Sequence, residues 1–304
     1  MQPTDRIWFD GRLVRWDEAT VHVTAHTLHY GWGVFEGIRC YECHDGQSAI
    51  FRLPEHNARL YGSARILGID VPVKPEDLAR ACAETVRANG LRSCYIRPLV
   101  FLGSGEMGLR AITNQVHVAV IAWPWGTYLG DEGVRKGIRV KTASIQRVHP
   151  NTLMTRAKAV GHYVNSILAN QEACAAGYDE ALLLDTDGLV AEGSGENIFI
   201  VEGGVVKTPP LSSVLPGITR DTACRILRAA GHAVVEERFT RDAVYLAEEA
   251  FLTGTAAEIT PIRELDGRPI GSGGPGPLTK ELQATFFRIV RGEEPQYAHW
   301  LTRV

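Results

Sequence analysis

The sequence lacks long apolar runs, an excess of either charge and a dense set of cysteines. No apolar run reaches the ~18 residues that a membrane span needs. The 32 basic and 35 acidic residues form no long block of one sign. We therefore expect no membrane insertion and no binding to nucleic acid. Six cysteines are scattered over 304 residues, and a chain long enough for a hydrophobic core needs no disulfide framework, so we expect reduced thiols in an unexported, cytoplasmic protein.

The first half of the chain predicts a small sheet covered by helices. Asp-Gly pairs at residues 10–11 and 45–46 favour two hairpins. The other elements expected here are helices over residues 54–67 and 75–89 and strands over 94–102 and 116–123. We assign residues 1–122 to a first domain and residues 123–133, which are rich in proline, glycine and aromatics, to an interdomain loop.

The second half, residues 134–304, predicts a larger domain of mixed α/β structure. Strands are expected over residues 137–144, 180–185, 197–201, 234–238 and 250–253, and helices over 157–175, 219–230 and 279–290.

Three patterns resemble ligand motifs but lack the context that those motifs need. Cys40–His44 has the spacing of haem attachment, which requires export. Gly103–Gly108 fits a dinucleotide fingerprint, yet a strand rather than a helix is expected after it. His22, His26 and His29 follow a strand-like alternation that would separate residues four apart by ~13 Å. We therefore expect no metal site.

Lysine is scarce, because only six of the 32 basic residues are lysines. Five of these adjoin turns, strands or a helix start, where solvation is expected. Lys158 instead lies among Ala157, Ala159 and Gly161, which leave room for a planar group, and Tyr163 follows. An apolar setting favours the neutral amine, which is a nucleophile toward aldehydes. The alternative is a lysine whose amine reaches solvent.

Three further segments favour a phosphate-bearing cofactor. Glu192 precedes a Gly-Ser-Gly turn at a strand end, although an ordinary turn would also explain the glycines. Residues 215–220 begin a helix whose amides can bind an anion, and residues 254–257 offer a hydroxyl and further amides. A lysine, a carboxylate and an anion site are the protein groups that pyridoxal phosphate chemistry requires.

Tyr95 and Arg97 alternate along one strand, so both side chains point from the same face. Pro98 predicts that this strand is an edge strand or carries a bulge. Arg97 is typical of a cleft that binds a carboxylate.

Six segments in order resemble the branched-chain amino acid aminotransferases, a group of fold type IV pyridoxal phosphate enzymes. The resemblance extends from Ile7 to Arg291. The segments are residues 29–39, 95–99, 155–163, 192–197, 215–221 and 254–261.

The resemblance implies a small N-terminal α/β domain and a larger C-terminal domain with a mixed-sheet pseudo-barrel. It also implies pyridoxal 5′-phosphate as cofactor. Lys158 would form the Schiff base and carry the proton of the substrate Cα, Glu192 would hold the pyridine nitrogen, and Tyr163 would hold the ring hydroxyl. The remaining cofactor contacts that it implies are Arg59, Leu215, Ile218, Thr219 and Thr255.

The implied reaction is reversible amino transfer between L-leucine, L-isoleucine or L-valine and 2-oxoglutarate, which gives branched-chain 2-oxo acids and L-glutamate. Apolar side chains would line the pocket, and Arg97 would accept the distal carboxylate. The implied substrate contacts are Phe35, Tyr95, Arg97, Trp125, Tyr128, Tyr163, Thr255 and Ala256, with Tyr30 and Leu109 from a neighbouring subunit. At least a homodimer is expected, with a trimer of dimers left open.

Other activities share these groups. D-amino acid aminotransferases, (R)-amine transaminases and aminodeoxychorismate lyases have the same lysine, glutamate and phosphate site, but residues 30–39 and 95–99 favour the branched-chain group. A non-catalytic pyridoxal phosphate-binding protein would need only the lysine and the phosphate site. The aromatic pocket and Arg97 argue against it. The effects of Arg156 and His162 beside the lysine stay open.

Overall fold

The chain forms two compact units in a computed structural model, which describes residues 2–110, 113–126 and 129–304. The first unit consists of the chain up to Gly126 together with residues 157–162 and 288–304. The remainder, residues 127–156 and 163–287, forms the second unit. Residues 157–162 and 288–304, which the sequence analysis placed in the second domain, are thus grouped with the first unit by their contacts. The linker expected at 123–133 stays a prediction.

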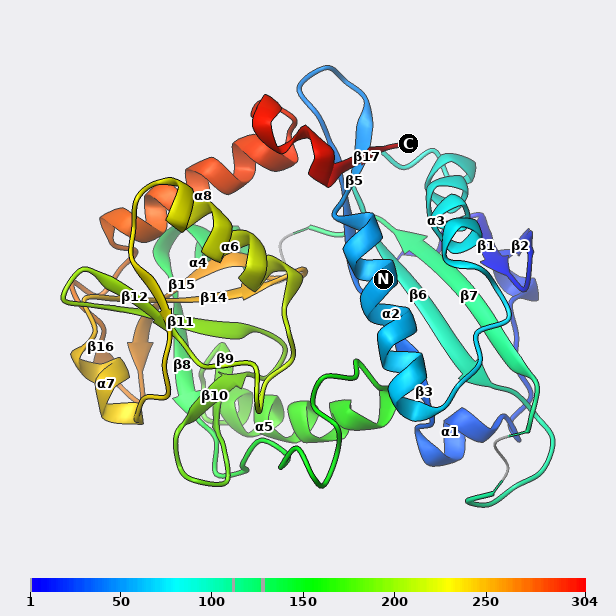
Figure 1. The fold of residues 1–304 in the computed structure, drawn as a ribbon, viewed down its shortest axis with the longest axis horizontal. Coiled ribbons are helices and arrows are strands. Elements are labelled where there is room, and N and C mark those ends of the chain that lie inside the picture. The colour runs from blue at the N-terminus through cyan, green and yellow to red at the C-terminus, as the bar shows by residue number, and fades with distance from the viewer. Residues whose placement is uncertain (1, 111–112, 127–128) are drawn as a thin grey trace. The chain divides into compact units, whose positions relative to one another are not determined.

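An antiparallel sheet is the scaffold of the first unit (Figure 1). Its strands follow the order β17-β5-β4-β6-β7-β1-β2, and β3 also pairs with β6. The two expected Asp-Gly hairpins are confirmed as β1–β2 and β4–β5. The strand bounds are β1 Arg6–Phe9, β2 Arg12–Arg15, β3 Gly33–Phe35, β4 Ile38–Glu42, β5 Ser48–Phe51, β6 Cys94–Leu102, β7 Val116–Trp123 and β17 Leu301–Arg303.

Two helices, α2 (Leu53–Leu67) and α3 (Pro75–Ala88), cover one face of this sheet. Each begins with proline in its first turn, where the missing N–H costs no hydrogen bond. Gly68 ends α2 in the left-handed conformation. Leu60 and Leu78 are fully buried in the cluster formed with the sheet, so the apolar stripes of both helices make the core of the unit. The short elements of this unit are η1 Trp16–Glu18, α1 His26–Tyr30, η2 Val160–His162 and η3 Pro295–Trp300.

The expectation that Pro98 marks an edge or bulged strand is wrong, because β6 lies inside the sheet. The Pro98 carbonyl accepts a hydrogen bond from the Glu36 N–H at 2.9 Å. In an extended strand the nitrogen and the carbonyl of one residue face the same side. The proline nitrogen therefore faces Glu36, at the interruption between β3, which ends at Phe35, and β4, which begins at Ile38, so the one ladder hydrogen bond that proline cannot donate falls at this interruption.

A mixed sheet forms the second unit, in the order β10-β9-β8-β15-β14-β11-β12-β13, with β16 beside β15. The pairs β8–β9, β8–β15 and β12–β13 are parallel and the other pairs are antiparallel. The strand bounds are β8 Ile138–Thr142, β9 Glu180–Leu184, β10 Val190–Gly193, β11 Asn197–Glu202, β12 Val205–Thr208, β13 Val234–Glu236, β14 Glu249–Gly254, β15 Glu258–Leu265 and β16 Arg268–Pro269.

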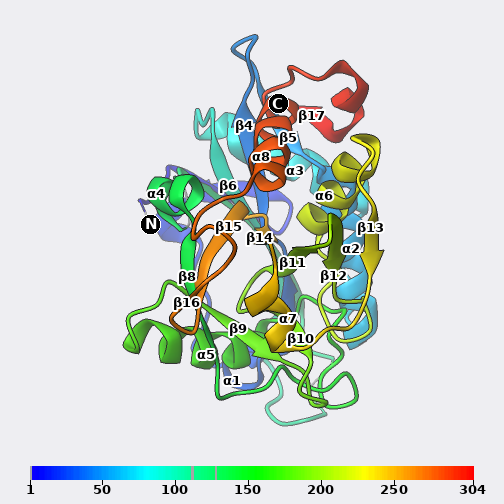
Figure 2. The same ribbon diagram turned by 90° about the vertical axis from the view of Figure 1, so that its left-hand side faces the viewer.

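The sheet curls, as Figure 2 shows, so that buried side chains from several of its strands meet in one cluster. Val140 of β8, Ile198 of β11 and Leu252 of β14 belong to this cluster, and all three are fully buried. The mixed α/β fold expected from the sequence is therefore confirmed. The helices are α4 Gly130–Lys136, α5 Tyr163–Ala175, α6 Ile218–Ala229, α7 Arg241–Leu246 and α8 Pro277–Val290, the last of which passes into the first unit at Arg288.

Two local predictions are wrong. The helix expected over residues 157–175 begins only at Tyr163, because Ala159 instead pairs with Val34 in an antiparallel bridge. Residues 21–23 form no strand, and His26 and His29 lie in the helix α1.

Within the described part of the chain, no helix is long and apolar enough to cross a membrane. No group of three or more histidine, cysteine, aspartate or glutamate side chains among those residues is placed to hold a metal ion.

Candidate active site

Lys158 lies in the first unit, in the segment that pairs with β3. Its carbonyl accepts a hydrogen bond from the Phe35 N–H at 3.1 Å, and its own N–H donates to Ser63 Oγ at 3.0 Å. Its Nζ lies 5.2 Å from the centroid of the Phe35 ring. The backbone is thus fixed from both sides, and the amine lies against an aromatic face.

Arg97 of β6 approaches the same aromatic ring. Its guanidinium carbon lies 4.6 Å from the centroid of Phe35, 5.5 Å from that of Tyr95 and 5.8 Å from that of Trp123. Its Nε is buried and has no hydrogen-bond partner among the described residues. Because a buried donor without a partner is costly, this guanidinium is suited to an anionic ligand.

Further aromatic rings of the first unit pack beside Arg97. The Tyr95 ring lies 4.7 Å from that of Trp125 and 5.2 Å from that of Trp123, measured between centroids. The structure therefore brings together five of the predicted residues, which are Phe35, Tyr95, Arg97, Trp125 and Lys158.

Arg59, on α2, forms an ion pair with the fully buried Glu36, with 2.6 Å between Arg59 Nε and Glu36 Oε1. Glu36 directly follows Phe35 in the chain, so Arg59 is tied to the backbone that lies against Lys158.

Tyr30 and Leu109 are not brought to this group of residues within the described part of the chain, and both are exposed, Leu109 by 89%. His26 connects the segments that carry them. Its ring lies 4.6 Å from that of Tyr30, and its Nε2 lies 3.0 Å from the Gly108 carbonyl oxygen.

Glu192 lies in the second unit and is 5% exposed. A register shift between Val190 and Glu192 in the pairing of β10 with β9 marks a bulge, which changes the direction of the side chain. Arg147 Nε donates to Glu192 Oε1 at 2.6 Å. Asn197 Nδ2 and the Leu215 N–H donate to Oε2 at 3.2 and 3.1 Å. Both carboxylate oxygens are therefore fixed by donors.

The N-terminus of α6 adjoins this network. Asn197 Nδ2 also donates to the Leu215 carbonyl at 3.0 Å. Gly217, the N-cap residue, contributes no side-chain cap, and a Cβ at this position would overlap Asn197 Oδ1. The first amides of α6, those of Ile218 and Thr219, belong to a twelve-residue helix whose dipole favours an anion.

The remaining predicted residues of the second unit lie at element ends. Thr255 and Ala256 form the turn between β14 and β15, next to the strand pair that joins Asn197 to Thr253. Tyr163 begins α5, whose Asn165 lies 3.5 Å from Arg147 Nη1. Tyr128 lies outside the described residues.

The sequence analysis missed Arg147, Asn197, Glu36 and Trp123, as well as His56, whose Nδ1 lies 2.7 Å from Glu36 Oε2. Arg147 stands 45 positions before Glu192 in an irregular segment, so no local pattern connects the two. Glu36 and Asn197 did leave a signal, because each is a polar residue beside an apolar strand and within a segment that resembles the family.

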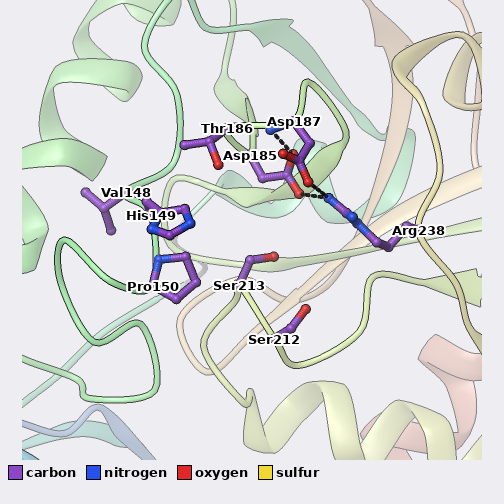
Figure 3. A pocket seen from close by; sticks show the side chains of 9 residues that line it. All are labelled: Val148, His149, Pro150, Asp185, Thr186, Asp187, Ser212, Ser213 and Arg238. Carbon is purple, nitrogen blue, oxygen red and sulfur yellow. Dashed lines mark hydrogen bonds and ion pairs between the residues drawn. The ribbon is translucent and has the colours of Figure 1, made fainter.

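A separate pocket of about 190 Å³ in the second unit contains none of the predicted residues (Figure 3). Arg238 lies 2.9 Å from Asp185 and 2.6 Å from Asp187. Arg238 and the two aspartates of the pocket are therefore paired with one another, and we assign no role to this pocket. The lining residues are Val148, His149, Pro150, Asp185, Thr186, Asp187, Ser212, Ser213 and Arg238.

Comparison with known proteins decides the family. The model of the amino-transferase class IV family matches residues 33–265. The chain belongs to the class IV aminotransferases. Among curated members, the branched-chain-amino-acid aminotransferase of Pseudomonas aeruginosa is 53% identical over 98% of this chain and 97% of its own length.

Solved structures of class IV aminotransferases agree with this assignment. The Escherichia coli branched-chain amino acid aminotransferase is similar with a TM-score of 0.96 and 46% identity, over 98% of both chains. The T.th. branched-chain amino acid aminotransferase complexed with N-(5′-phosphopyridoxyl)-L-glutamate has a TM-score of 0.95 and 48% identity, over 99% of both chains.

The pyridoxal phosphate cofactor of the class IV aminotransferases fits the groups present. An amine at Lys158 suits a carbonyl cofactor, and the fixed carboxylate of Glu192 suits a protonated ring nitrogen. The side-chain-free Gly217 at the α6 N-terminus suits close approach of a phosphate.

The ion pair of Arg147 and Glu192 predicts a large stability effect. Both side chains are less than a tenth exposed, so Arg147→Met leaves a buried carboxylate without its cationic partner. We expect the free energy of unfolding of the cofactor-free chain to fall by about 3–5 kcal/mol, as measured by urea denaturation. Arg225→Met is the control, because Arg225 and its partner Asp221 are exposed and such pairs contribute at most ~1 kcal/mol. Equal losses in the two variants would contradict this interpretation of the pair.

Proposed function

We propose that the protein is a branched-chain-amino-acid aminotransferase dependent on pyridoxal 5′-phosphate. It transfers amino groups reversibly between L-leucine, L-isoleucine or L-valine and 2-oxoglutarate, and so forms branched-chain 2-oxo acids and L-glutamate. The names of the similar proteins support this substrate class, and the glutamate adduct named for the T.th. structure supports glutamate as amino donor or product.

One observation carries the proposal. The Lys158 amine and the Arg97 guanidinium lie against the same Phe35 ring, at 5.2 and 4.6 Å from its centroid. The ring gives an apolar surface for a branched side chain, and the guanidinium gives a partner for a distal carboxylate. One pocket can therefore accept leucine in one half-reaction and 2-oxoglutarate in the other.

The chain's own groups divide the work on a bound cofactor. When bound, pyridoxal 5′-phosphate supplies an electron sink for the charge that develops at the substrate Cα. Lys158 Nζ takes the Cα proton and returns it as a general base and acid. Glu192 keeps the ring nitrogen protonated, and Arg147 and Asn197 hold its carboxylate in place for this role. Tyr163 holds the ring hydroxyl.

The phosphate would be held by groups of three kinds. Arg59 supplies a guanidinium, the amides of Ile218 and Thr219 supply the helix N-terminus, and Thr255 supplies a hydroxyl. Leu215, whose backbone is hydrogen-bonded to Glu192 and Asn197, would lie against the ring of the cofactor. The proposed substrate contacts are Phe35, Tyr95, Arg97, Trp125, Tyr128, Tyr163, Thr255 and Ala256.

We also propose that the enzyme is at least a homodimer in which Tyr30 and Leu109 reach the pocket of the neighbouring subunit. Their exposure, 42% and 89%, and their link through His26 support a role at a surface that a second copy covers.

A cytoplasmic location is proposed from the thiols. All six cysteines are free, and five of them are buried. A reducing compartment maintains this state.

Replacement of Lys158 tests the catalytic assignment. Lys158→Ala removes the amine, so we expect the rate of transamination of L-leucine with 2-oxoglutarate to fall by about a hundredfold to ten-thousandfold, or more. The phosphate contacts remain, so some cofactor should still co-purify with the full chain. Lys280→Ala, at an exposed site on α8, is the control and should keep normal rates. Near-normal turnover in Lys158→Ala would contradict the assignment.

Replacement of Arg97 tests the shared pocket. Arg97→Ala removes the partner of the distal carboxylate, so kcat/KM for 2-oxoglutarate should fall by about ten- to a hundredfold and kcat/KM for L-leucine should fall much less. The matched control is Arg65→Ala, because Arg65 is exposed on α2. Equal losses with both substrates would rule out the proposed role of Arg97.

A further inference from the structure

A buried charge cluster formed by Glu36, His56 and Arg59 adjoins Phe35. Glu36 lies at the interruption between β3 and β4. Glu36 is fully buried. Its carboxylate accepts hydrogen bonds from Arg59 Nε at 2.6 Å and Arg59 Nη2 at 2.8 Å. His56 Nδ1 lies 2.7 Å from Glu36 Oε2. Both Arg59 and His56 come from α2, so one carboxylate on the sheet holds two side chains of the helix.

The charges of this cluster are well defined. Burial alone would raise the pKa of the Glu36 carboxyl, but the charge of Arg59 and the hydrogen bonds from Arg59 and His56 hold it well below its usual range. Burial lowers the pKa of His56; the charge and hydrogen bond of Glu36 act to raise it, but with the charge of Arg59 the net shift is downward. Near neutral pH the cluster thus holds an ionised Glu36, a charged Arg59 and a neutral His56 that donates through Nδ1.

The two hydrogen bonds from Arg59 to Glu36, a two-point contact, fix the orientation of the Arg59 guanidinium. A guanidinium has five N–H groups in one plane. Glu36 takes one from Nε and one from Nη2, so the other three lie along the remaining edges of that plane. An arginine side chain has several rotatable bonds and little preferred orientation of its own, so the paired carboxylate sets the direction of these groups.

We propose that Glu36 is a positioning residue that sets the affinity of this protein for a phosphate monoester, by holding Arg59 in the orientation that binds the phosphate. The inference rests on the proposed function, in which Arg59 binds the cofactor phosphate. Glu36 itself touches neither substrate nor cofactor in this account.

Two effects of the carboxylate oppose each other. Its negative charge weakens the attraction of the cluster for phosphate, whereas its bidentate contact orients the guanidinium. In Glu36→Gln the amide N–H₂ cannot accept a hydrogen bond, so it faces a donor on Arg59 or His56 and the two-point contact is lost. The orientation effect dominates, because a phosphate is recognised by paired N–H groups in a fixed geometry.

The test compares two ligands that differ only by the phosphate. The full chain, freed of cofactor, is titrated with pyridoxamine 5′-phosphate and with pyridoxamine, neither of which forms a bond to Lys158. In Glu36→Gln we expect the Kd for pyridoxamine 5′-phosphate to rise about tenfold or more, and the Kd for pyridoxamine to change little. In an Arg59→Ala background, Glu36→Gln should have no further effect on the Kd for pyridoxamine 5′-phosphate.

The matched control is Glu55→Gln. Glu55 lies on α2 and, like Glu36, pairs with an arginine, here Arg52 at 2.7 Å. It is outside the cluster, so both Kd values should stay near those of the unaltered protein. If Glu36→Gln does not fold, Glu36→Asp replaces it. Aspartate keeps the charge but is one methylene shorter, so the same phosphate-specific loss is expected.

The possible results are distinguishable. Unchanged or tighter binding of pyridoxamine 5′-phosphate by Glu36→Gln, with weaker binding by Arg59→Ala, would overturn the inference and leave the proposed function intact. Equal losses for both ligands would also overturn it, because they would indicate a purely structural role. Normal binding by Arg59→Ala would overturn the phosphate role of Arg59 itself and, with it, the inference.

Discussion

The two hydrogen bonds on the backbone of Lys158 are the constraint on which the proposed chemistry depends. Phe35 donates to its carbonyl and Ser63 accepts from its N–H. Further along the segment, the Gly161 N–H donates to the Gly31 carbonyl at 3.1 Å. Gly31 has a φ of 66°, and a Cβ there would lie 2.8 Å from Gly161 Cα, so only glycine allows this approach. A segment held in this way keeps the amine at the Phe35 ring, where a substrate carbon can be met in a fixed geometry.

Arg59 and Glu192, two charged groups proposed for the cofactor, are each held by a buried partner of opposite charge. Arg59 is held by Glu36, and Glu192 is held by Arg147. Such pairs contribute little to stability relative to a well-packed apolar core, because desolvation opposes the attraction. Their benefit is orientation, which matters where a ligand must be bound with its reacting atoms in place. Arg97 differs, since its described contacts are with aromatic rings, and we propose that its charge acts on a substrate.

The elements that local sequence patterns determine were predicted well. The strands β6 and β7 have the predicted bounds, and the Asp-Gly hairpins and the proline-started helices α2 and α3 are where turn and cap residues place them. Tertiary contacts explain the failures. The helix expected from Ala157 is replaced by a bridge to Val34, because pairing with β3 outweighs helix propensity. Pro98 is tolerated inside a sheet because it lies opposite the interruption between the strands β3 and β4. Arg147 is connected to Glu192 only by the fold, so no sequence spacing could reveal it.

The visible spectrum of the purified protein with its cofactor tests the central claim, which is that one pocket carries out both half-reactions of branched-chain amino transfer. L-Leucine is added in the absence of any 2-oxo acid, and 2-oxoglutarate is added afterwards, with D-alanine and an (R)-amine as parallel samples. The account predicts that the yellow absorption of the cofactor disappears with L-leucine alone and returns with 2-oxoglutarate. Loss of the colour with D-alanine or the (R)-amine, but not with L-leucine, would contradict the pocket built from Phe35, Tyr95 and Arg97.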